Sequence, residues 1–280
     1  MKTVSLPSGE QVPALGQGTW NMGDRAATRA EEVAALRRGL DHGLTLVDTA
    51  EMYGSGRSEE LVAEAIAGRR DEVFLVSKVL PENATRRGTI AACERSLKRL
   101  KTDRLDLYLL HWRGSVPFAE TLEALLRLQA DGKIRHHGVS NLDCGEMREW
   151  CSLRGGSGGQ GVATDQVLYN LSRRGVEWDL APWLRDKRIP LMAYSPLEQA
   201  RLLTHKGLVA FSKKHGLSPA QAALAWLLAQ DNVIAIPKCG NRTRLADNLG
   251  ALEHPLAPAQ LAELDAIFPP PRRAQPLEML

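Results

Sequence analysis

The chain has few cysteines, and their spacing fits neither a disulfide framework nor a metal site. Only 4 of the 280 residues are cysteine, and they form no CxxC pair and no metal-type spacing with the 7 histidines. Disulfide scaffolds are a feature of oxidising compartments. We therefore expect a cytoplasmic protein that holds no metal ion.

The sequence also lacks long hydrophobic runs and a strong charge of either sign. Its most apolar stretch, residues 220–236, is interrupted by two glutamines, an aspartate and an asparagine, so no membrane span is predicted. The first ten residues do not resemble a signal peptide. The formal net charge is only +3 and the basic residues are dispersed, which argues against a nucleic-acid partner but allows a local basic pocket for a phosphate.

What the chain does contain is a regular alternation of short apolar runs and helical patterns. Apolar residues make up 44% and charged residues 25%, which is ordinary for a soluble globular protein. Runs that are apolar on both faces are typical of parallel strands covered by helices. The predicted strands are Ala14–Gly18, Leu44–Val47, Val73–Ser77, Leu105–Leu110, His137–Val139, Thr164–Tyr169, Ile189–Tyr194 and Val233–Ile236.

Helical patterns with recognisable ends lie between these runs. The predicted capping pairs are Thr28 with Glu31, Asp143 with Glu146, and Ser218 with Gln221. Strands alternating with helices allow either an open doubly wound sheet or a closed barrel, and the number of strands favours the barrel. We predict one α/β domain over residues 1–280, a (β/α)8 TIM barrel, with an N-terminal β-hairpin at residues 1–13 and a short C-terminal tail at residues 270–280.

Polar side chains follow the predicted strands where each one ends. Asp48, Lys78 and His111 follow three consecutive strands, and the carboxyl ends of barrel strands meet on the face that carries active sites. Any one of them alone would be read as an ordinary loop charge or a half-buried histidine. Their recurrence, with Tyr53 in the loop after Asp48, predicts a site.

These four side chains have complementary chemistry. A phenol has a reference pKa near 10, and a nearby ammonium such as that of Lys78 favours its ionised form. Asp48 can pair with Lys78, and His111 can donate a hydrogen bond to a carbonyl oxygen. Together they predict a general acid for a carbonyl group that is reduced by hydride.

Motifs spread from about residue 3 to residue 270 resemble those of the aldo-keto reductase family. Each motif is weak alone, but all of them in order at barrel spacing are specific. They are Gly18-Thr19-Trp20, Asp48 to Gly54, Leu75 to Lys78, Asp106 to Trp112, Gly132 to Arg135, Gly138 to Asn141, Gln166 to Asn170, Ala193 to Leu197, and Ile236-Pro237-Lys238.

The resemblance implies an NADP-dependent oxidoreductase that reduces aldehydes, ketones or dicarbonyls to alcohols. The family's catalytic tetrad falls on Asp48, Tyr53, Lys78 and His111. The implied cofactor contacts are Ser140, Asn141 and Gln166 at the carboxamide, Tyr194 on the nicotinamide ring, Ser195, Pro196 and Leu197 at the pyrophosphate, Lys238 and Arg244 at the 2′-phosphate, and Asn248 at the adenine, with Gly18, Thr19, Trp20, Ile236, Pro237, Cys239 and Asp247 completing the site.

Two departures from the family pattern bear on cofactor choice. Cys239 stands where a serine is common, and Asp247 where a glutamate is usual. Two cations near a phosphate dianion still favour NADPH, with NADH as a weaker cofactor.

The predicted partner is a small carbonyl compound. The chain looks most like small bacterial reductases of aldehydes and of dicarbonyls such as methylglyoxal. Trp20, Tyr53, His111 and Trp112 form the predicted substrate pocket, and the tail after Pro270 is too short to narrow it much. The resemblance also suggests a monomer or weak dimer.

A glycine-rich segment and the fold itself each allow another interpretation. The segment 156–161 formally satisfies G-x-G-x-x-G, but a helix precedes it and a strand follows, which is the reverse of the dinucleotide fingerprint; we interpret it as a surface loop. A non-enzymatic regulatory subunit of the same fold would bind the dinucleotide without turnover. The complete tetrad favours an enzyme.

Overall fold

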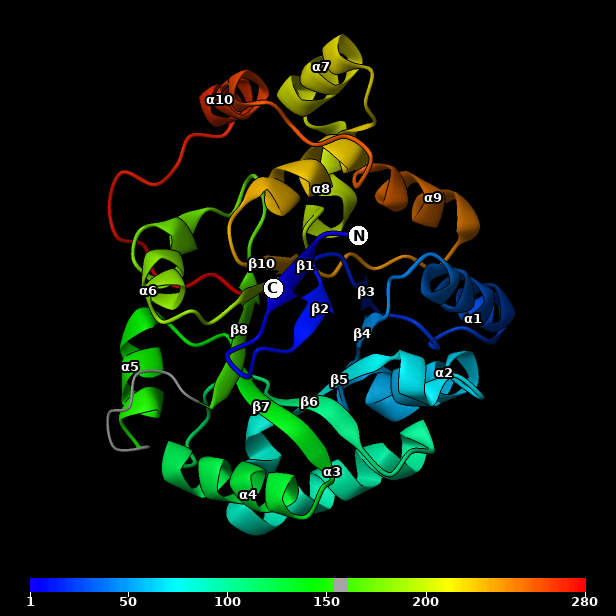
Figure 1. Ribbon diagram of the computed structural model, residues 1–280, viewed down its shortest axis with the longest axis vertical. Helices are drawn as coiled ribbons and strands as arrows, with labels where there is room; N and C mark the ends of the chain where they lie inside the picture. The colour runs from blue at the N-terminus through cyan, green and yellow to red at the C-terminus, as the bar shows by residue number, and fades with distance from the viewer. Residues whose placement is uncertain (154–160) are drawn as a thin grey trace.

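The computed structural model describes residues 1–153 and 161–280 (Figure 1). The strands are β1 (Thr3–Ser5), β2 (Gln11–Pro13), β3 (Gln17–Gly18), β4 (Leu46–Asp48), β5 (Phe74–Val79), β6 (Leu105–Leu110), β7 (Ile134–Ser140), β8 (Val162–Leu168), β9 (Leu191–Tyr194) and β10 (Val233–Ala235). The α-helices are α1 (Ala26–Asp41), α2 (Arg57–Ala65), α3 (Arg86–Leu100), α4 (Phe118–Ala130), α5 (Cys144–Ser152), α6 (Leu180–Asp186), α7 (Lys206–His215), α8 (Pro219–Ala229), α9 (Arg242–Gly250) and α10 (Pro258–Ile267). Short 3-10 helices are η1 (Tyr53–Gly56), η2 (Arg70–Glu72), η3 (Pro81–Asn83), η4 (Gly175–Glu177) and η5 (Glu198–Thr204).

Strands β3 to β10 form a parallel sheet in which each strand pairs with its neighbours in sequence. The sheet closes on itself through parallel bridges between Leu15 and Ala235 and between Gly18 and Lys238. A Cβ atom on Gly18 would lie 2.7 Å from the carbonyl oxygen of Ile236, so only glycine allows this approach. The predicted (β/α)8 barrel is confirmed.

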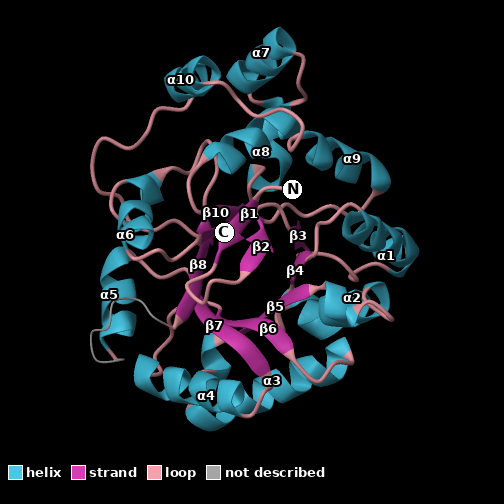
Figure 2. Cartoon of the chain, in the orientation of Figure 1, coloured by secondary structure: helices cyan, strands magenta, loops and turns pink. Residues whose placement is uncertain are grey.

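Helices surround the strands on all sides, as Figure 2 shows. Strands β4, β5, β6 and β8 are buried along their whole length, which explains why they are apolar on both faces. Helices α7 and α10 pack against each other outside this ring (Figure 1). The hairpin of β1 and β2 precedes the barrel as predicted and lies at its amino-terminal end, where Glu10 contacts Arg135 and His136.

The predicted helix starts are correct in two of three cases. Asp143 and Ser218 cap α5 and α8 in capping boxes. The pair Thr28 and Glu31 is wrong, because α1 already begins at Ala26 and has no side-chain cap. The hydroxyl of Thr28 instead bonds the Arg25 carbonyl and the carboxylate of Glu32.

Strand boundaries move by up to three residues: β7 begins at Ile134 rather than His137, and β3 at Gln17 rather than Ala14. Of the glycine-rich segment 156–161, residues 156–160 lie outside the described residues. Among the residues that are described, no helix is both long and apolar enough to cross a membrane.

Candidate active site

A cavity of about 540 Å³ opens at the carboxyl ends of the barrel strands, within the usual size range of ligand pockets. It is lined by Gly18, Thr19, Trp20, Asn21, Asp48, Met52, Tyr53, His111, Trp112, Ser140, Asn141, Gln166, Tyr194, Ser195, Pro196, Leu197, Gln199, Ala200, Leu203, Ala220, Ile236, Pro237, Lys238, Arg244, Asp247, Asn248, Met279 and Leu280. The part of the chain that is described contains no cluster of three or more histidine, cysteine or acidic side chains placed to hold a metal ion.

Lys78 lies behind this cavity and is fully buried at the end of β5. Its ammonium nitrogen is 2.9 and 2.8 Å from the two carboxylate oxygens of Asp48 and 2.8 Å from the carbonyl oxygen of Thr49. It is also 3.1 Å from the hydroxyl oxygen of Tyr53. Because an ammonium only donates, Tyr53 accepts this hydrogen bond and keeps its own proton for another acceptor.

The charges around Tyr53 oppose one another. Burial raises the pKa of Tyr53 above its ordinary value, the Lys78 ammonium lowers it, and the Asp48 carboxylate raises it again. The lowering predicted from Lys78 is present, but burial outweighs it. For Lys78, burial lowers the pKa while Asp48 and Tyr53 raise it, and the net result lies above the ordinary value. At neutral pH the site therefore holds a neutral phenol beside an ammonium.

His111 faces Tyr53 across the cavity, with ring centroids 5.9 Å apart. Burial, helped by the Lys78 charge, lowers the pKa of His111 to about 2, so the imidazole is neutral. Its buried Nδ1 has no hydrogen-bond partner among the described residues. The cavity therefore contains a neutral imidazole able to orient a polar group of a ligand.

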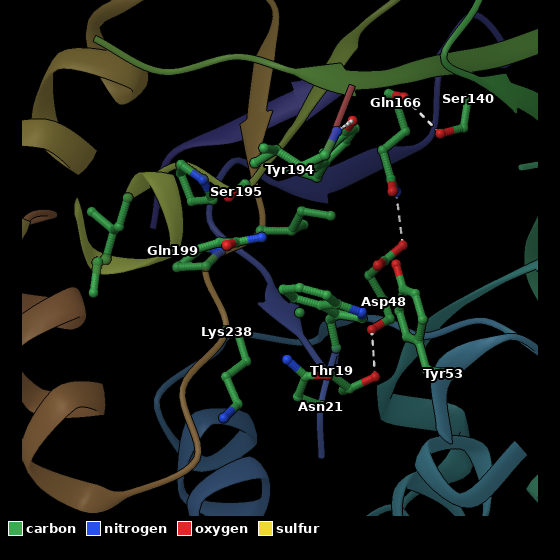
Figure 3. Close-up of a pocket in the computed structure, with 18 of the residues that line it drawn as sticks. Thr19, Asn21, Asp48, Tyr53, Ser140, Gln166, Tyr194, Ser195, Gln199 and Lys238 are labelled. Carbon is green, nitrogen blue, oxygen red and sulfur yellow. Dashed lines mark hydrogen bonds between the residues drawn. The ribbon is translucent and has the colours of Figure 1, made fainter. Parts of the chain in front are cut away.

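The residues predicted to contact the carboxamide and the nicotinamide ring come together at the ends of β7, β8 and β9, and hydrogen bonds join several of them (Figure 3). The Ser140 hydroxyl donates to the Gln166 carbonyl at 2.7 Å, and the Gln166 amide donates to Asp48 at 2.7 Å. The Tyr194 hydroxyl donates to Asn141 at 3.0 Å. Gln166 and Lys78 thus both donate hydrogen bonds to the Asp48 carboxylate.

Two exposed cations lie toward the other end of the cavity, where Figure 3 shows Lys238 well away from Tyr53. Within residues 1–153 and 161–280, neither Lys238 nor Arg244 has an ion-pair partner. Asp247 accepts a hydrogen bond from Ser218 at 2.6 Å, and Asn248 is buried. The predicted contact Cys239 does not line the cavity, because its thiol is buried and donates to the carbonyl of Asn241.

Several cavity residues were missed by sequence reasoning, and the tail is the main correction. Met279 and Leu280 line the cavity, although the tail was expected to add little. The backbone N–H of Leu280 donates to the Tyr194 hydroxyl at 3.4 Å. No local pattern in the tail signals this return to the site. Asn21, Met52, Gln199, Ala200, Leu203 and Ala220 are the other additions, and all but Ala220 sit in loops or 3-10 segments that follow strands.

Comparisons with known proteins agree with this geometry. The family model described as "Aldo/keto reductase family" matches residues 14–268. Methylglyoxal reductase YeaE of Escherichia coli is 48% identical over 284 residues, covering 100% of this chain and 99% of that protein. Glyoxal reductase of Bacillus subtilis is 31% identical, covering 95% and 92%.

A solved structure supports the same assignment. An aldo/keto reductase from Klebsiella pneumoniae, in complex with NADP and acetate, matches with a TM-score of 0.94 and 48% identity, covering 100% of this chain and 99% of that one. The predicted family and fold are both confirmed. The chain belongs to the aldo/keto reductase family.

Proposed function

We propose that this protein reduces small aldehydes and dicarbonyl compounds to alcohols with NADPH, and that Tyr53 donates the proton. The observation that carries the proposal is the contact between the Tyr53 hydroxyl and the buried Lys78 ammonium at the wall of the cavity. The Lys78 ammonium, itself held by Asp48, fixes the phenol oxygen and favours the negative charge that develops on it as the proton leaves.

The protein's own groups then handle the carbonyl oxygen. Neutral His111 orients it, and the Tyr53 proton goes to it as negative charge develops. Lys78 stabilises the phenolate left behind. His111 is buried, and its ring centroid lies 4.8 Å from that of Trp112. Burial lowers the local dielectric constant, which strengthens these interactions.

The residues present fit a nicotinamide dinucleotide phosphate. Bound NADPH would supply the hydride. Tyr194 offers a half-buried ring beside the amides of Asn141 and Gln166, which suits the nicotinamide end. Lys238 and Arg244, free of carboxylate partners in the part of the chain described, suit the 2′-phosphate. The Klebsiella pneumoniae structure described above is a complex with NADP, and a second aldo-keto reductase structure from that organism, also 48% identical with a TM-score of 0.94, is a complex with NADPH.

The substrate class follows from the cavity and from the relatives. Trp20 and Trp112 line the cavity with Tyr53 and His111, giving a mostly apolar wall with few polar groups. Relatives named for methylglyoxal and glyoxal act on small dicarbonyls. We propose the same class here.

The test is NADPH consumption at 340 nm with methylglyoxal and with 4-nitrobenzaldehyde, repeated with NADH. We expect turnover of both compounds and a clear preference for NADPH. NADPH binding without turnover of either compound would contradict the proposal and favour the regulatory alternative.

We further propose that the chain acts as one domain, as a monomer or weak dimer, in the cytoplasm. The continuous hydrophobic core from Val4 to Phe268 supports the single domain. Size-exclusion chromatography with light scattering tests the oligomeric state, since a monomer has a mass of 30.7 kDa.

A further inference from the structure

The connection between β8 and α6 carries an arginine that forms ion pairs with two segments whose neighbouring residues line the cavity. Arg173 is 2.9 Å from Glu198 in η5 and 2.5 Å from Glu278 in the tail. Segment η5 contributes Gln199 and Ala200 to the cavity wall, and the tail contributes Met279 and Leu280. Arg173 therefore joins two wall segments that are 80 residues apart in the sequence (278 − 198).

The Glu198 side of this bridge is rigidly held. The Glu198 side chain is only 6% exposed, and it also accepts hydrogen bonds from Asn170 at 2.8 Å and Arg201 at 3.0 Å. Burial raises the pKa of Glu198, but the hydrogen bonds from Arg173 and Asn170 lead a set of interactions that keep it below its ordinary value. The carboxylate is thus a fixed charge on which Arg173 is oriented.

The tail has few other attachments. Leu277 packs partly buried against the core, and the Gln275 side chain lies close to Gly175. Met279 and Leu280 remain 50% and 51% exposed, so they are not buried by packing. The ion pair between Glu278 and Arg173 lies directly before these two residues.

The tail also reaches the reacting end of the cavity. Leu280 donates to Tyr194, Tyr194 donates to Asn141, and the Asn141 amide donates to the carbonyl of His111 at 3.1 Å. The end of the tail is therefore connected by three hydrogen bonds to a residue that faces the Tyr53 ring. Met279 and Leu280 line the same cavity as Tyr53 and His111.

Met279 and Leu280 line the cavity, and we propose that Arg173 is the positioning residue that fixes this wall through Glu278. Resting on the proposed function, this makes the pair Arg173–Glu278 a determinant of specificity: it favours small carbonyl compounds over bulky ones. Arg173 does not touch the reacting atoms, and it acts through the tail.

The central variant is Glu278→Gln, which keeps the shape of the side chain and removes its charge. Because the pair is partly exposed, we expect the ratio of kcat/KM for 4-nitrobenzaldehyde to that for methylglyoxal to rise about two- to fivefold. Met279→Ala shortens the wall directly and should raise the same ratio roughly tenfold. In both variants, Kd for NADPH, measured by quenching of tryptophan fluorescence, should stay within about twofold of the wild-type value.

Arg201→Gln is the matched control, because Arg201 bonds the same Glu198 oxygen but has no contact with the tail among the described residues. It should leave the ratio unchanged. A readout independent of activity is amide hydrogen exchange of the tail, followed by mass spectrometry. Glu278→Gln should speed exchange in residues 270–280, whereas Arg201→Gln should not.

If exchange in Glu278→Gln were faster but the ratio of kcat/KM values did not change, the tail would not control substrate size. If exchange did not change, Arg173 would not anchor the tail. An equal loss of kcat/KM for both aldehydes would also contradict a role in specificity. If the wild-type protein consumed no NADPH with either aldehyde, the proposed function would fail. Comparing exchange in Glu278→Gln and Arg201→Gln would still decide whether Arg173 anchors the tail.

Discussion

At the scale of single residues, the site depends on how one ammonium distributes its hydrogen bonds. Lys78 has three N–H donors, and it contacts Asp48, Thr49 and Tyr53. The contact to Thr49 fixes the lysine to the backbone, and the contact to Asp48 keeps it charged although it is fully buried. The remaining donor is directed at the phenol oxygen, and this makes the Tyr53 proton the one available to a substrate.

Tyr53→Phe removes that proton and keeps the ring. We expect turnover to fall by at least about 100-fold, the lower end of what a positioned general acid contributes. NADPH binding, followed by fluorescence quenching, should persist. Tyr169→Phe is the control, because that hydroxyl bonds Glu177 at 2.8 Å and does not line the cavity. Near wild-type kcat in Tyr53→Phe would mean that another group, first of all His111, supplies the proton.

Arg244→Ala tests the cofactor preference. The loss of a charge-assisted hydrogen bond to a phosphate, about 1.5–3 kcal/mol, corresponds to roughly ten- to hundredfold weaker binding. KM for NADPH should rise by this factor, and KM for NADH should hardly change. Arg242→Ala, an exposed neighbour on α9 that does not line the cavity, should affect neither. Equal effects of Arg244→Ala on both cofactors would place the phosphate elsewhere.

At the scale of elements, β8 shows two different uses of buried polar side chains. Gln166 points into the barrel and bonds Asp48, so its burial serves the site. Asp165, the preceding residue, has no exposed surface, and its side chain points to the opposite face of the sheet. Neither of its oxygens has a hydrogen-bond partner of ordinary geometry among the described residues.

The ionisation of Asp165 should make the stability of the protein depend on pH. Burial raises the pKa of Asp165 well above its ordinary value, the nearby Leu142 amide offsets only part of this, and Glu146 and Asp143 raise it further. A carboxyl with a raised folded-state pKa stabilises the fold fully below its unfolded pKa of about 4, and this stability is lost as the pH rises toward the folded value.

Asp165→Asn removes the titration and nearly keeps the shape. At pH 7 to 8 we expect the variant to be more stable than the wild type by about 1 kcal/mol or more, the scale of an unsatisfied buried polar group. The difference should shrink as the pH falls toward 4. Urea unfolding at several pH values measures both. A variant that is less stable at every pH would show that the carboxylate has a partner that the amide cannot replace.

At the scale of the whole molecule, the barrel depends on closure between its first and last strands. Gly18 and Lys238 form one of the two closing bridges, and the side chain of Lys238 is one of the two cations proposed to hold the cofactor phosphate. The same backbone contact therefore completes the barrel and places Lys238 at the cavity.

Gly18→Ala should weaken this closure. The added methyl group would lie 2.7 Å from the Ile236 carbonyl oxygen, so the strands must separate. We expect a loss of about 1–3 kcal/mol in the free energy of unfolding, as for other overpacked sites. Gly145→Ala is the control, because its added Cβ would meet only the Asp143 side chain at 3.3 Å. Equal stability of Gly18→Ala and the wild type in urea would show that the barrel does not need this approach.

The sequence alone determined the order of the strands, the barrel and the meeting of four polar side chains at one end of it. Each of these depends on local patterns: apolar runs set the strands, and the residue after a strand must lie at the carboxyl end of the barrel. Asp48, Lys78 and His111 were predicted in this way, and the structure brings them together with Tyr53.

Only the tertiary structure decided how the pKa values of these groups are shifted and which segments enclose the cavity. The pKa of Tyr53 depends on the balance between burial and two charges, which no spacing in the sequence reveals. The start of α1 was predicted wrongly, and the path of the tail was missed. The tail reaches the cavity through contacts such as Arg173–Glu278, whose partners are 105 residues apart. Such a contact depends on how completed elements pack, so it has no signature in the local sequence.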